Sequence, residues 1–273
     1  MVRRMLILGF AIALWSCHKN DSTKNTSAKR LTSVSLYVVN GDTHDRQTDS
    51  ILYDNNNRMI ECRRMFFDTI MNSAGSITYV ASGHTSFVFS YSGSNKLPSS
   101  YLTTYSYSSN IQHHLLTYDN DNQIMKDSSV QQSPAVVLSN IYFSYAPNTI
   151  VAKTTNPSGF SGFRVDSFLL QNANVTTRYY KFTPQSGSNS VDQVTYSTIP
   201  NPLYNFKGIG ILLYEIGGNY FDYVSQNLFS NISNSSNLGN TSIIWSTDAD
   251  GNAISGSGLT NGSVALRITF NYN

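Results

Sequence analysis

The chain has 273 residues, of which 40% are hydrophobic, 12% are aromatic and only 12% are charged, with 18 basic residues against 16 acidic ones. The abundant Tyr and Phe exclude a disordered chain, and the balanced charge gives no basic footprint for nucleic acid or for acidic lipid headgroups. The length suits one large domain whose solubility comes from Ser, Thr and Asn rather than from charge.

The first residues have the pattern of a secretory signal. Arg3 and Arg4 give a positive start, and residues 5–14 form an uncharged apolar run that is too short for the roughly 20 residues of a membrane-spanning helix. The following Leu14-Trp15-Ser16-Cys17 resembles the lipobox of bacterial lipoproteins, in which the cysteine is lipidated and begins the mature chain. Trp15 is larger than usual there, so an ordinary signal peptide is the alternative. We predict a lipoprotein signal peptide over residues 1–16 and lipid on Cys17, which would anchor the protein stably in a membrane.

The next segment has the composition of a flexible tether. From His18 to Thr26 there is no apolar residue, and we assign residues 17–30 to the tether. Removing residues 1–16 leaves 257 residues, and the loss of Arg3 and Arg4 leaves 16 basic against 16 acidic residues. Residues 31–273 are predicted to form a single domain of repeated β-hairpins.

A tyrosine followed by a turn organises this domain. The copies are Tyr53-Asp54-Asn55-Asn56-Asn57-Arg58-Met59, Tyr91-Ser92-Gly93-Ser94-Asn95-Lys96-Leu97, Tyr118-Asp119-Asn120-Asp121-Asn122-Gln123-Ile124 and the shorter Tyr145-Ala146-Pro147-Asn148-Thr149-Ile150. The last three tyrosines are 27 residues apart. Alternating apolar residues before each tyrosine predict a strand with one apolar face, and the Asn, Asp and Gly residues reverse the chain. Each copy is therefore predicted to be a β-hairpin.

The C-terminal part continues the pattern with one interruption. Residues 248–252 form another turn, and the run 264–272 alternates as a strand with apolar residues at every even position. In contrast, Phe221, Val224, Leu228, Phe229 and Ile232 follow a helical stripe, and Gly208–Glu215 is a second helix candidate. We expect one or two short helices near residues 203–231 that cover an edge or an open face of the sheet. The predicted fold class is all-β, a curved antiparallel meander of repeated hairpins that forms an open or partly closed barrel-like sheet.

These copies resemble YD-type repeats, and together with the lipobox they resemble Bacteroidetes lipoproteins of a domain-of-unknown-function family with a porin-like β fold. The step Tyr196-Ser197-Thr198-Ile199-Pro200-Asn201-Pro202-Leu203 resembles the Asn-Pro segment of that family, Leu228–Asn231 its helical exit, and residues 248–254 its last turn. The resemblance covers residues 31–273, although Ser92 and Ala146 replace the repeat aspartate in two copies. It implies the fold and no reaction, cofactor or catalytic residue.

Few residues are candidates for chemistry. Cys62 is the second of only two cysteines and is expected to be a buried apolar residue, so no disulfide framework is predicted. His113 and His114 are adjacent and should point to opposite faces of a strand, which does not suit a shared metal. The turns at residues 119–123 and 248–252 resemble the start of calcium loops but lack the later ligands. We therefore predict no catalytic residue, no metal and no cofactor.

Three further possibilities concern glycans and hydrolysis. Exposed tyrosines could stack on sugars, although alternating aromatics usually pack across strands. Asp49-Ser50-Ile51 and Asp68-Thr69-Ile70 match a three-residue O-glycosylation pattern of the Bacteroidetes. Carboxylate pairs for glycoside hydrolysis are matched in space and have no sequence signature.

The sequence as a whole predicts a lipid-anchored cell-envelope lipoprotein with a non-enzymatic binding or structural role. The alternatives are a surface glycan-binding accessory lipoprotein, a cell-envelope hydrolase and a membrane-spanning barrel. The expected partner is the membrane, through the lipid on Cys17, with a glycan or an envelope protein as a further partner and no nucleic acid. The expected location is the outer membrane, on its periplasmic or its cell-surface face.

Overall fold

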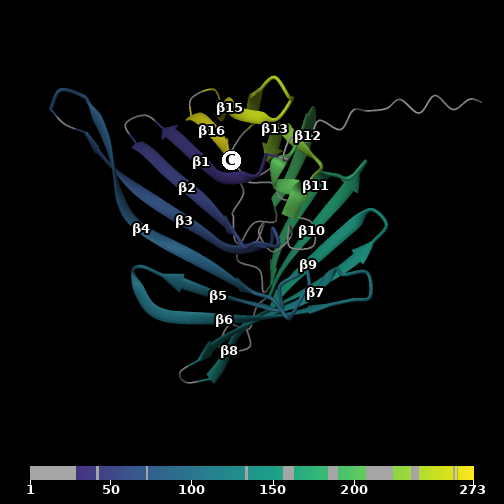
Figure 1. The fold of residues 1–273 in the computed structure, drawn as a ribbon. Helices are drawn as coiled ribbons and strands as arrows, with labels where there is room; N and C mark the ends of the chain where they lie inside the picture. Colours follow the sequence, from purple (N-terminus) through teal and green to yellow (C-terminus); the bar gives the residue numbers. More distant parts are fainter. Residues whose placement is uncertain are drawn as a thin grey trace, which may run out of the picture.

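The computed structural model describes residues 29–40, 43–71, 73–132, 135–155, 163–183, 190–206, 224–234, 240–260, 262 and 264–273. Every strand in them pairs antiparallel with its neighbours, and the first strand also pairs with the last, so the sheet closes into a 16-stranded barrel (Figure 1). The strands are β1 Leu31–Asn40, β2 Thr43–Tyr53, β3 Met59–Met71, β4 Ile77–Ser90, β5 Ser100–Tyr105, β6 Ser108–Tyr118, β7 Ile124–Gln132, β8 Ala135–Ala146, β9 Thr149–Thr155, β10 Phe163–Gln171, β11 Asn174–Thr183, β12 Ser190–Pro200, β13 Asn227–Asn234, β14 Thr241–Thr247, β15 Ala253–Thr260 and β16 Val264–Tyr272. The all-β meander predicted from the hairpin repeats is confirmed, and closure, which the sequence left open, is complete.

The predicted helical region is only partly helical. A 3-10 helix, η1, spans Pro202–Phe206 and is the only helix among the described residues. The stripe through Leu228, Phe229 and Ile232 was wrong as a helix, because these residues lie on β13. Register irregularities between β12 and β13 break the strict alternation there, so two consecutive residues, Leu228 and Phe229, are both buried. Phe221 and the candidate helix 208–215 lie outside the described residues.

All the repeat turns lie at one end of the barrel. Because the chain is an antiparallel meander, the connections after β2, β4, β6, β8, β10, β12 and β14 share an end, together with Arg30 and the C-terminal Asn273, which bond through their backbones. We call this the turn end. At the opposite end the hairpin of β3 and β4 projects beyond its neighbours (Figure 1).

The repeat tyrosines close the hairpins at the turn end. In six strand pairs the same bond lies just beyond the last cross-strand residue pair. The tyrosine follows that pair by three residues on one strand, and its hydroxyl donates to the carbonyl of the residue two positions before the pair on the other strand. The bonds, from 2.6 to 3.1 Å, are Tyr53 to Leu31, Tyr91 to Met59, Tyr118 to Pro98, Tyr145 to Ile124, Tyr196 to Val175 and Tyr272 to Ala253. The repeat therefore encodes one recurring solution to an unpaired carbonyl at a partly buried position.

Three turns share one geometry as well. The carboxylates of Asp54, Asp119 and Asp248 each accept the backbone N–H groups two and four residues later. The fourth residue of each turn, Asn57, Asn122 or Gly251, has a positive φ, which Asn and Gly tolerate. Turn chemistry accordingly explains the Asp and Asn content of the repeats.

Candidate functional site

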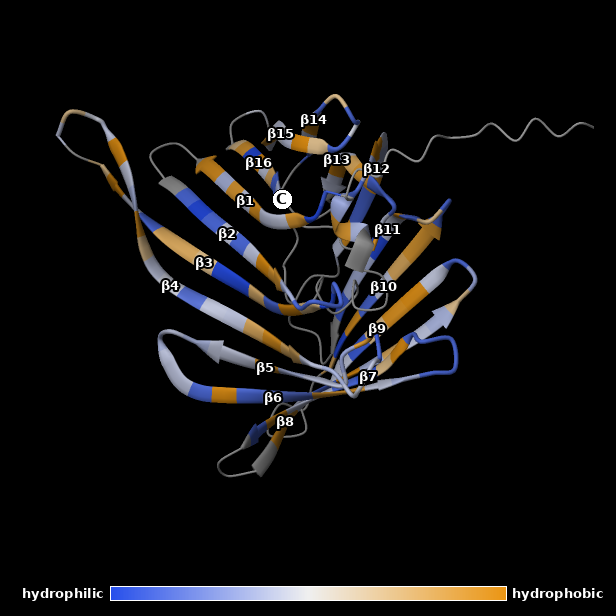
Figure 2. Cartoon of the chain, viewed as in Figure 1, coloured by the Kyte–Doolittle hydropathy of each residue, from blue (hydrophilic) through white to orange (hydrophobic). Residues whose placement is uncertain are grey.

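The two faces of the barrel wall differ in chemistry. On regular strands the buried residues follow every second position and point inward, as on β16, where Leu266, Ile268 and Phe270 are buried while Ala265 and Arg267 are exposed. The inner face packs Phe, Ile, Leu and Tyr near the turn end, and Leu203 of η1 joins this core. Hydrophobic and hydrophilic residues alternate along the strands in Figure 2. The outward positions carry Ser, Thr and Asn together with exposed apolar residues, among them Leu115, Ile244 and Leu259.

Charged residues on the strands are sorted between these faces. The pairing registers place six basic residues and one acidic residue outward: Arg46, Glu61, Arg63, Lys126, Lys153, Lys181 and Arg267. They place six acidic and three basic residues on the inner face: Asp45, Asp49, Arg64, Asp68, Asp127, Arg164, Asp166, Arg178 and Asp192. The sequence did not predict this sorting of charge between the two faces of the described strands, because a balance of charge over the chain does not say which face each residue occupies.

Buried ion pairs lie on the inner face of the barrel, beside the apolar core. Asp49 is 0% exposed, and the Arg64 guanidinium on the adjacent strand donates to its carboxylate from Nε at 2.9 Å and from Nη2 at 2.8 Å. The amide of Gln47 donates a further bond at 3.1 Å. This bidentate geometry compensates both charges inside the barrel.

Two other carboxylates on the inner face are matched in the same way. Asp127 accepts from the Tyr101 hydroxyl at 2.6 Å and lies 3.0 Å from Nδ1 of His114, whose ring stacks on Tyr101. Asp166 lies 2.6 Å from Nε of Arg164 and 3.3 Å from Nη2 of Arg178. Asp49, Asp127 and Asp166 thus each face a cation or a histidine, which compensates their charge inside the barrel.

The candidates from the sequence fall into different places. His114 points inward to Asp127 and His113 outward, as predicted from their adjacency. Cys62 is buried, and burial raises the pKa of its thiol well above the usual range, in keeping with a structural role. No group of three or more His, Cys, Asp or Glu residues that could hold a metal occurs in the described part of the chain. Cys17, His18 and the signal peptide lie outside the described residues.

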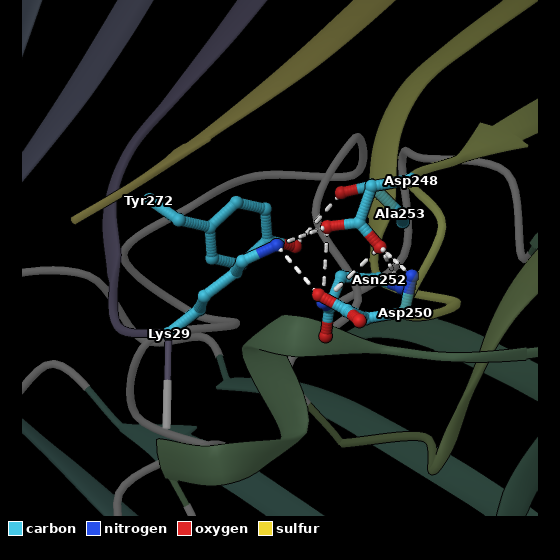
Figure 3. A network of polar contacts seen from close by, with 6 residues as sticks. All are labelled: Lys29, Asp248, Asp250, Asn252, Ala253 and Tyr272. Carbon is cyan, nitrogen blue, oxygen red and sulfur yellow. Dashed lines mark hydrogen bonds and ion pairs between the residues drawn. The ribbon is translucent and has the colours of Figure 1, made fainter. Parts of the chain in front are cut away.

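In the two calcium-like turns, carboxylate oxygens of the aspartates already bind donors of the protein itself. In the 248–252 turn, the Lys29 ammonium binds Asp248 at 2.8 Å and Asp250 at 2.9 Å (Figure 3). Hydrogen bonding from Lys29, followed by that from Asn252, lowers the pKa of Asp248 below its usual range. In the 119–123 turn, the Asp119 carboxylate accepts the backbone N–H groups of Asp121 at 2.9 Å and of Gln123 at 2.8 Å. In the related repeat turn at 54–58, hydrogen bonds from Arg58 lower the pKa of Asp54.

Ion pairs and hydrogen bonds of this kind link neighbouring turns and fix where the chain enters the barrel. Lys29, two residues before β1, binds the 248–252 turn beside Tyr272 (Figure 3). Arg30 donates to Asn57 of the next turn around the barrel, and Arg58 donates to the carbonyls of Gly93 and Asn95 in the turn after that. Lys29 and Arg30, the last two residues of the predicted tether, are therefore held at the turn end.

Most aromatic residues are used in packing. The repeat tyrosines are half-buried with bonded hydroxyls, and Trp245 packs against Phe229 and Phe270 while its indole N–H donates to the Phe229 carbonyl. They are therefore not available as sugar platforms. The exposed aromatics of the described residues include Tyr107, Tyr142 and Tyr179. Of the two O-glycosylation patterns, the Asp49 site has its aspartate inside the barrel, and the Asp68 site lies on the projecting hairpin.

One outward feature escaped the sequence analysis. Lys126, Tyr142, Lys153, Val165 and Lys181 are direct cross-strand partners on β7, β8, β9, β10 and β11, so they form a single row across five strands. We call it the lysine row. Its lysines are 27 and 28 residues apart, close to the 27-residue spacing of the last three repeat tyrosines, and this spacing is the signal that could have revealed it.

Taken together, the closed wall and its 16 antiparallel strands define a porin-like β-barrel, an architecture associated with the outer membrane. The chain is similar to a porin-like protein from Bacteroides uniformis, with a TM-score of 0.48 and 12% sequence identity over 89% of this chain and 96% of that chain. No protein-family model matches the chain, and no curated protein matches it either. The closed antiparallel barrel confirms the β-barrel fold that the YD-type resemblance implied, whereas membership of that family stays a prediction.

Proposed function

We propose that the protein is an exported lipoprotein of the outer membrane, held by lipid on Cys17, whose barrel stands outside the bilayer and acts by binding rather than by catalysis. Its wall, in this proposal, is not the membrane-spanning part. The lipobox supplies the anchor, and the tether meets the barrel at the turn end beside Lys29.

The chemistry of the outer face carries this proposal. A membrane-spanning barrel needs an outward apolar band, and each Lys or Arg facing lipid at the midplane costs about 2–4 kcal/mol. Here the described strands present six basic residues outward, and Ser, Thr and Asn interrupt the exposed apolar residues there, such as Leu115, Ile244 and Leu259. The lysine row alone would place three of them in lipid.

A non-enzymatic role agrees with the inner face. The buried carboxylates of Asp49, Asp127 and Asp166 are each engaged by a neighbouring cation or histidine. The one buried thiol, Cys62, has a raised pKa that disfavours the reactive thiolate. These features support a packed scaffold that presents its outer surface to a partner.

Removing the anchor tests the proposal. The variant Cys17→Ala, expressed in a bacterium that lipidates its lipoproteins, is expected to leave the membrane fraction and to appear folded in a detergent-free extract. Cys62→Ala is the matched control, since it removes the other cysteine and should stay in the membrane. A Cys17→Ala protein that remains in membranes and needs detergent for extraction would show that the wall itself is inserted.

Protease shaving of intact cells then determines the orientation. Release of barrel peptides would place the domain on the cell surface, and protection with Cys17 acylated would place it in the periplasm. A mature Cys17 terminus without lipid would refute the anchor.

A further inference from the structure

We infer that the lysine row on the outer face of β7–β11 binds a linear acidic polysaccharide that lies across the strands and carries about one negative charge per disaccharide. The inference rests on the proposed function in one respect, namely that this face is in water and not in lipid.

The charge of the row defines the sign of the ligand. Among the described residues, Lys126, Lys153 and Lys181 form no ion pair, and every acidic residue on β7–β12 lies on the inner face. Lys153 and Lys181 are exposed, and Lys126 is half-buried. Three cations with no carboxylate beside them on the same face form an uncompensated basic strip.

The spacing of the row fits a polymer. The three lysines stand on every second strand, so their backbone positions are about 10 Å apart because neighbouring strands are about 4.8 Å apart. An extended pyranose chain advances by roughly one strand spacing per sugar residue. A glycan with one acid in each disaccharide would therefore bring a carboxylate to each lysine in turn.

Side chains around the lysines suit sugar rings. Tyr142, which lies between Lys126 and Lys153, is 45% exposed, and the Lys126 ammonium sits 5.4 Å from its ring centroid. Lys153 lies 4.6 Å from the Phe163 ring. These contacts hold the lysines along the sheet and leave an aromatic surface between two cations, where a ring can stack.

Hydroxyl and amide groups flank the row on both sides. Ser128, Asn140 and Thr155 are cross-strand partners one step toward the opposite end, and Ser144 and Ser167 lie one step toward the turn end. The Ser128 hydroxyl already donates to the Asn140 amide oxygen at 2.9 Å, which orients this pair across the sheet. Such groups can exchange hydrogen bonds with sugar hydroxyls, whereas a lipid surface would use apolar residues instead.

The test measures binding of defined polyanions to the full-length protein purified from its membrane. A hyaluronan oligosaccharide, with one carboxylate per disaccharide, is expected to bind at low salt and to dissociate as salt screens the charges. Neutral dextran of similar length should not bind. The triple variant Lys126→Gln, Lys153→Gln and Lys181→Gln should weaken binding roughly ten- to a hundredfold, from three exposed ion pairs of ordinary strength.

Matched variants separate the row from total charge. Removing three positive charges elsewhere, by Arg63→Gln, Lys96→Gln and Arg267→Gln, should change the affinity by no more than about twofold. Tyr142→Ser should weaken binding by about three- to tenfold, while Tyr142→Phe should retain it. Equal losses from the two charge triples would show a nonspecific effect and overturn the inference.

Other outcomes also decide against it. Tighter binding to anionic phospholipid vesicles or to single-stranded DNA than to the oligosaccharide would assign the row to another partner, and binding of dextran would remove the role of charge. Failure to bind any acidic polysaccharide would overturn this inference alone. The release of Cys17→Ala is measured without a ligand, so failure of the proposed function is seen separately.

Discussion

The tyrosine bonds at the turn end predict a definite loss of stability on removal of a single oxygen atom. In Tyr145→Phe the ring stays, but the Ile124 carbonyl loses the donor that lies 3.1 Å away. Ile124 is 0% exposed, so water cannot easily replace that donor. An unsatisfied buried carbonyl costs about 1–3 kcal/mol, and we expect the free energy of unfolding to fall by about 1.5 kcal/mol.

Equilibrium urea unfolding followed by tyrosine fluorescence measures this loss. For a barrel of this size the same change lowers Tm by about 3–6 °C. Tyr107→Phe is the control, because Tyr107 is 73% exposed, and it should stay within about 0.5 kcal/mol of the parent. If Tyr145→Phe is no less stable than Tyr107→Phe, the hydroxyl is not capping the carbonyl, and the explanation of the repeat fails. Tyr91→Phe and Tyr272→Phe repeat the experiment at equivalent bonds.

Three further predictions concern the half-buried Tyr91, the buried pair of Arg64 and Asp49, and Gly256 beside Trp245. Burial raises the pKa of Tyr91 to about 12, above its value of about 10 in the unfolded chain. The native state therefore keeps the Tyr91 proton to a higher pH than the unfolded chain does. The contribution of this tyrosine to stability is complete below pH 10 and is lost as the pH rises to 12. Unfolding midpoints and tyrosinate absorbance at 295 nm across that pH range measure the loss. Arg64→Ala should cost about 3–5 kcal/mol in urea unfolding, because Asp49 is left buried without its partner, whereas the exposed neighbour variant Arg63→Ala should cost less than about 1 kcal/mol. Gly256→Ala should lose about 1–3 kcal/mol, since its new Cβ would lie 2.5 Å from the Trp245 ring; an unchanged Tm would contradict that packing.

The meander was predictable because each hairpin has a local sequence pattern of its own. Alternation before each tyrosine and a tight turn after it specify two strands and their connection within about a dozen residues. The β16 pattern was confirmed position by position, with Leu266, Ile268 and Phe270 inside. Such local patterns are enough to predict a meander, because strands that follow each other in the sequence pair with each other.

Closure and the segment before β13 could not be predicted in the same way. The pairing of Leu36 with Ile268 joins residues that are far apart in the chain, and no residue pattern distinguishes it from an open edge. At β13 the irregular register buries Leu228 and Phe229 in succession, and with Ile232 the spacing imitates a helix. Periodicity fails there because it assumes a regular strand.

The candidate site was hidden for a related reason. A net charge of zero describes residues 17–273, which have 16 basic and 16 acidic residues, whereas a barrel wall separates residues by their parity along each strand. Adjacent residues such as Lys126 and Asp127 cancel in the sequence, yet the barrel sends the lysine outward and the aspartate inward. The inner aspartates are satisfied by Arg64, His114 and Arg178 on neighbouring strands, so the outer lysines are left without partners on their own face. The same alternation that builds the apolar core thus produces a basic outer surface from a neutral sequence.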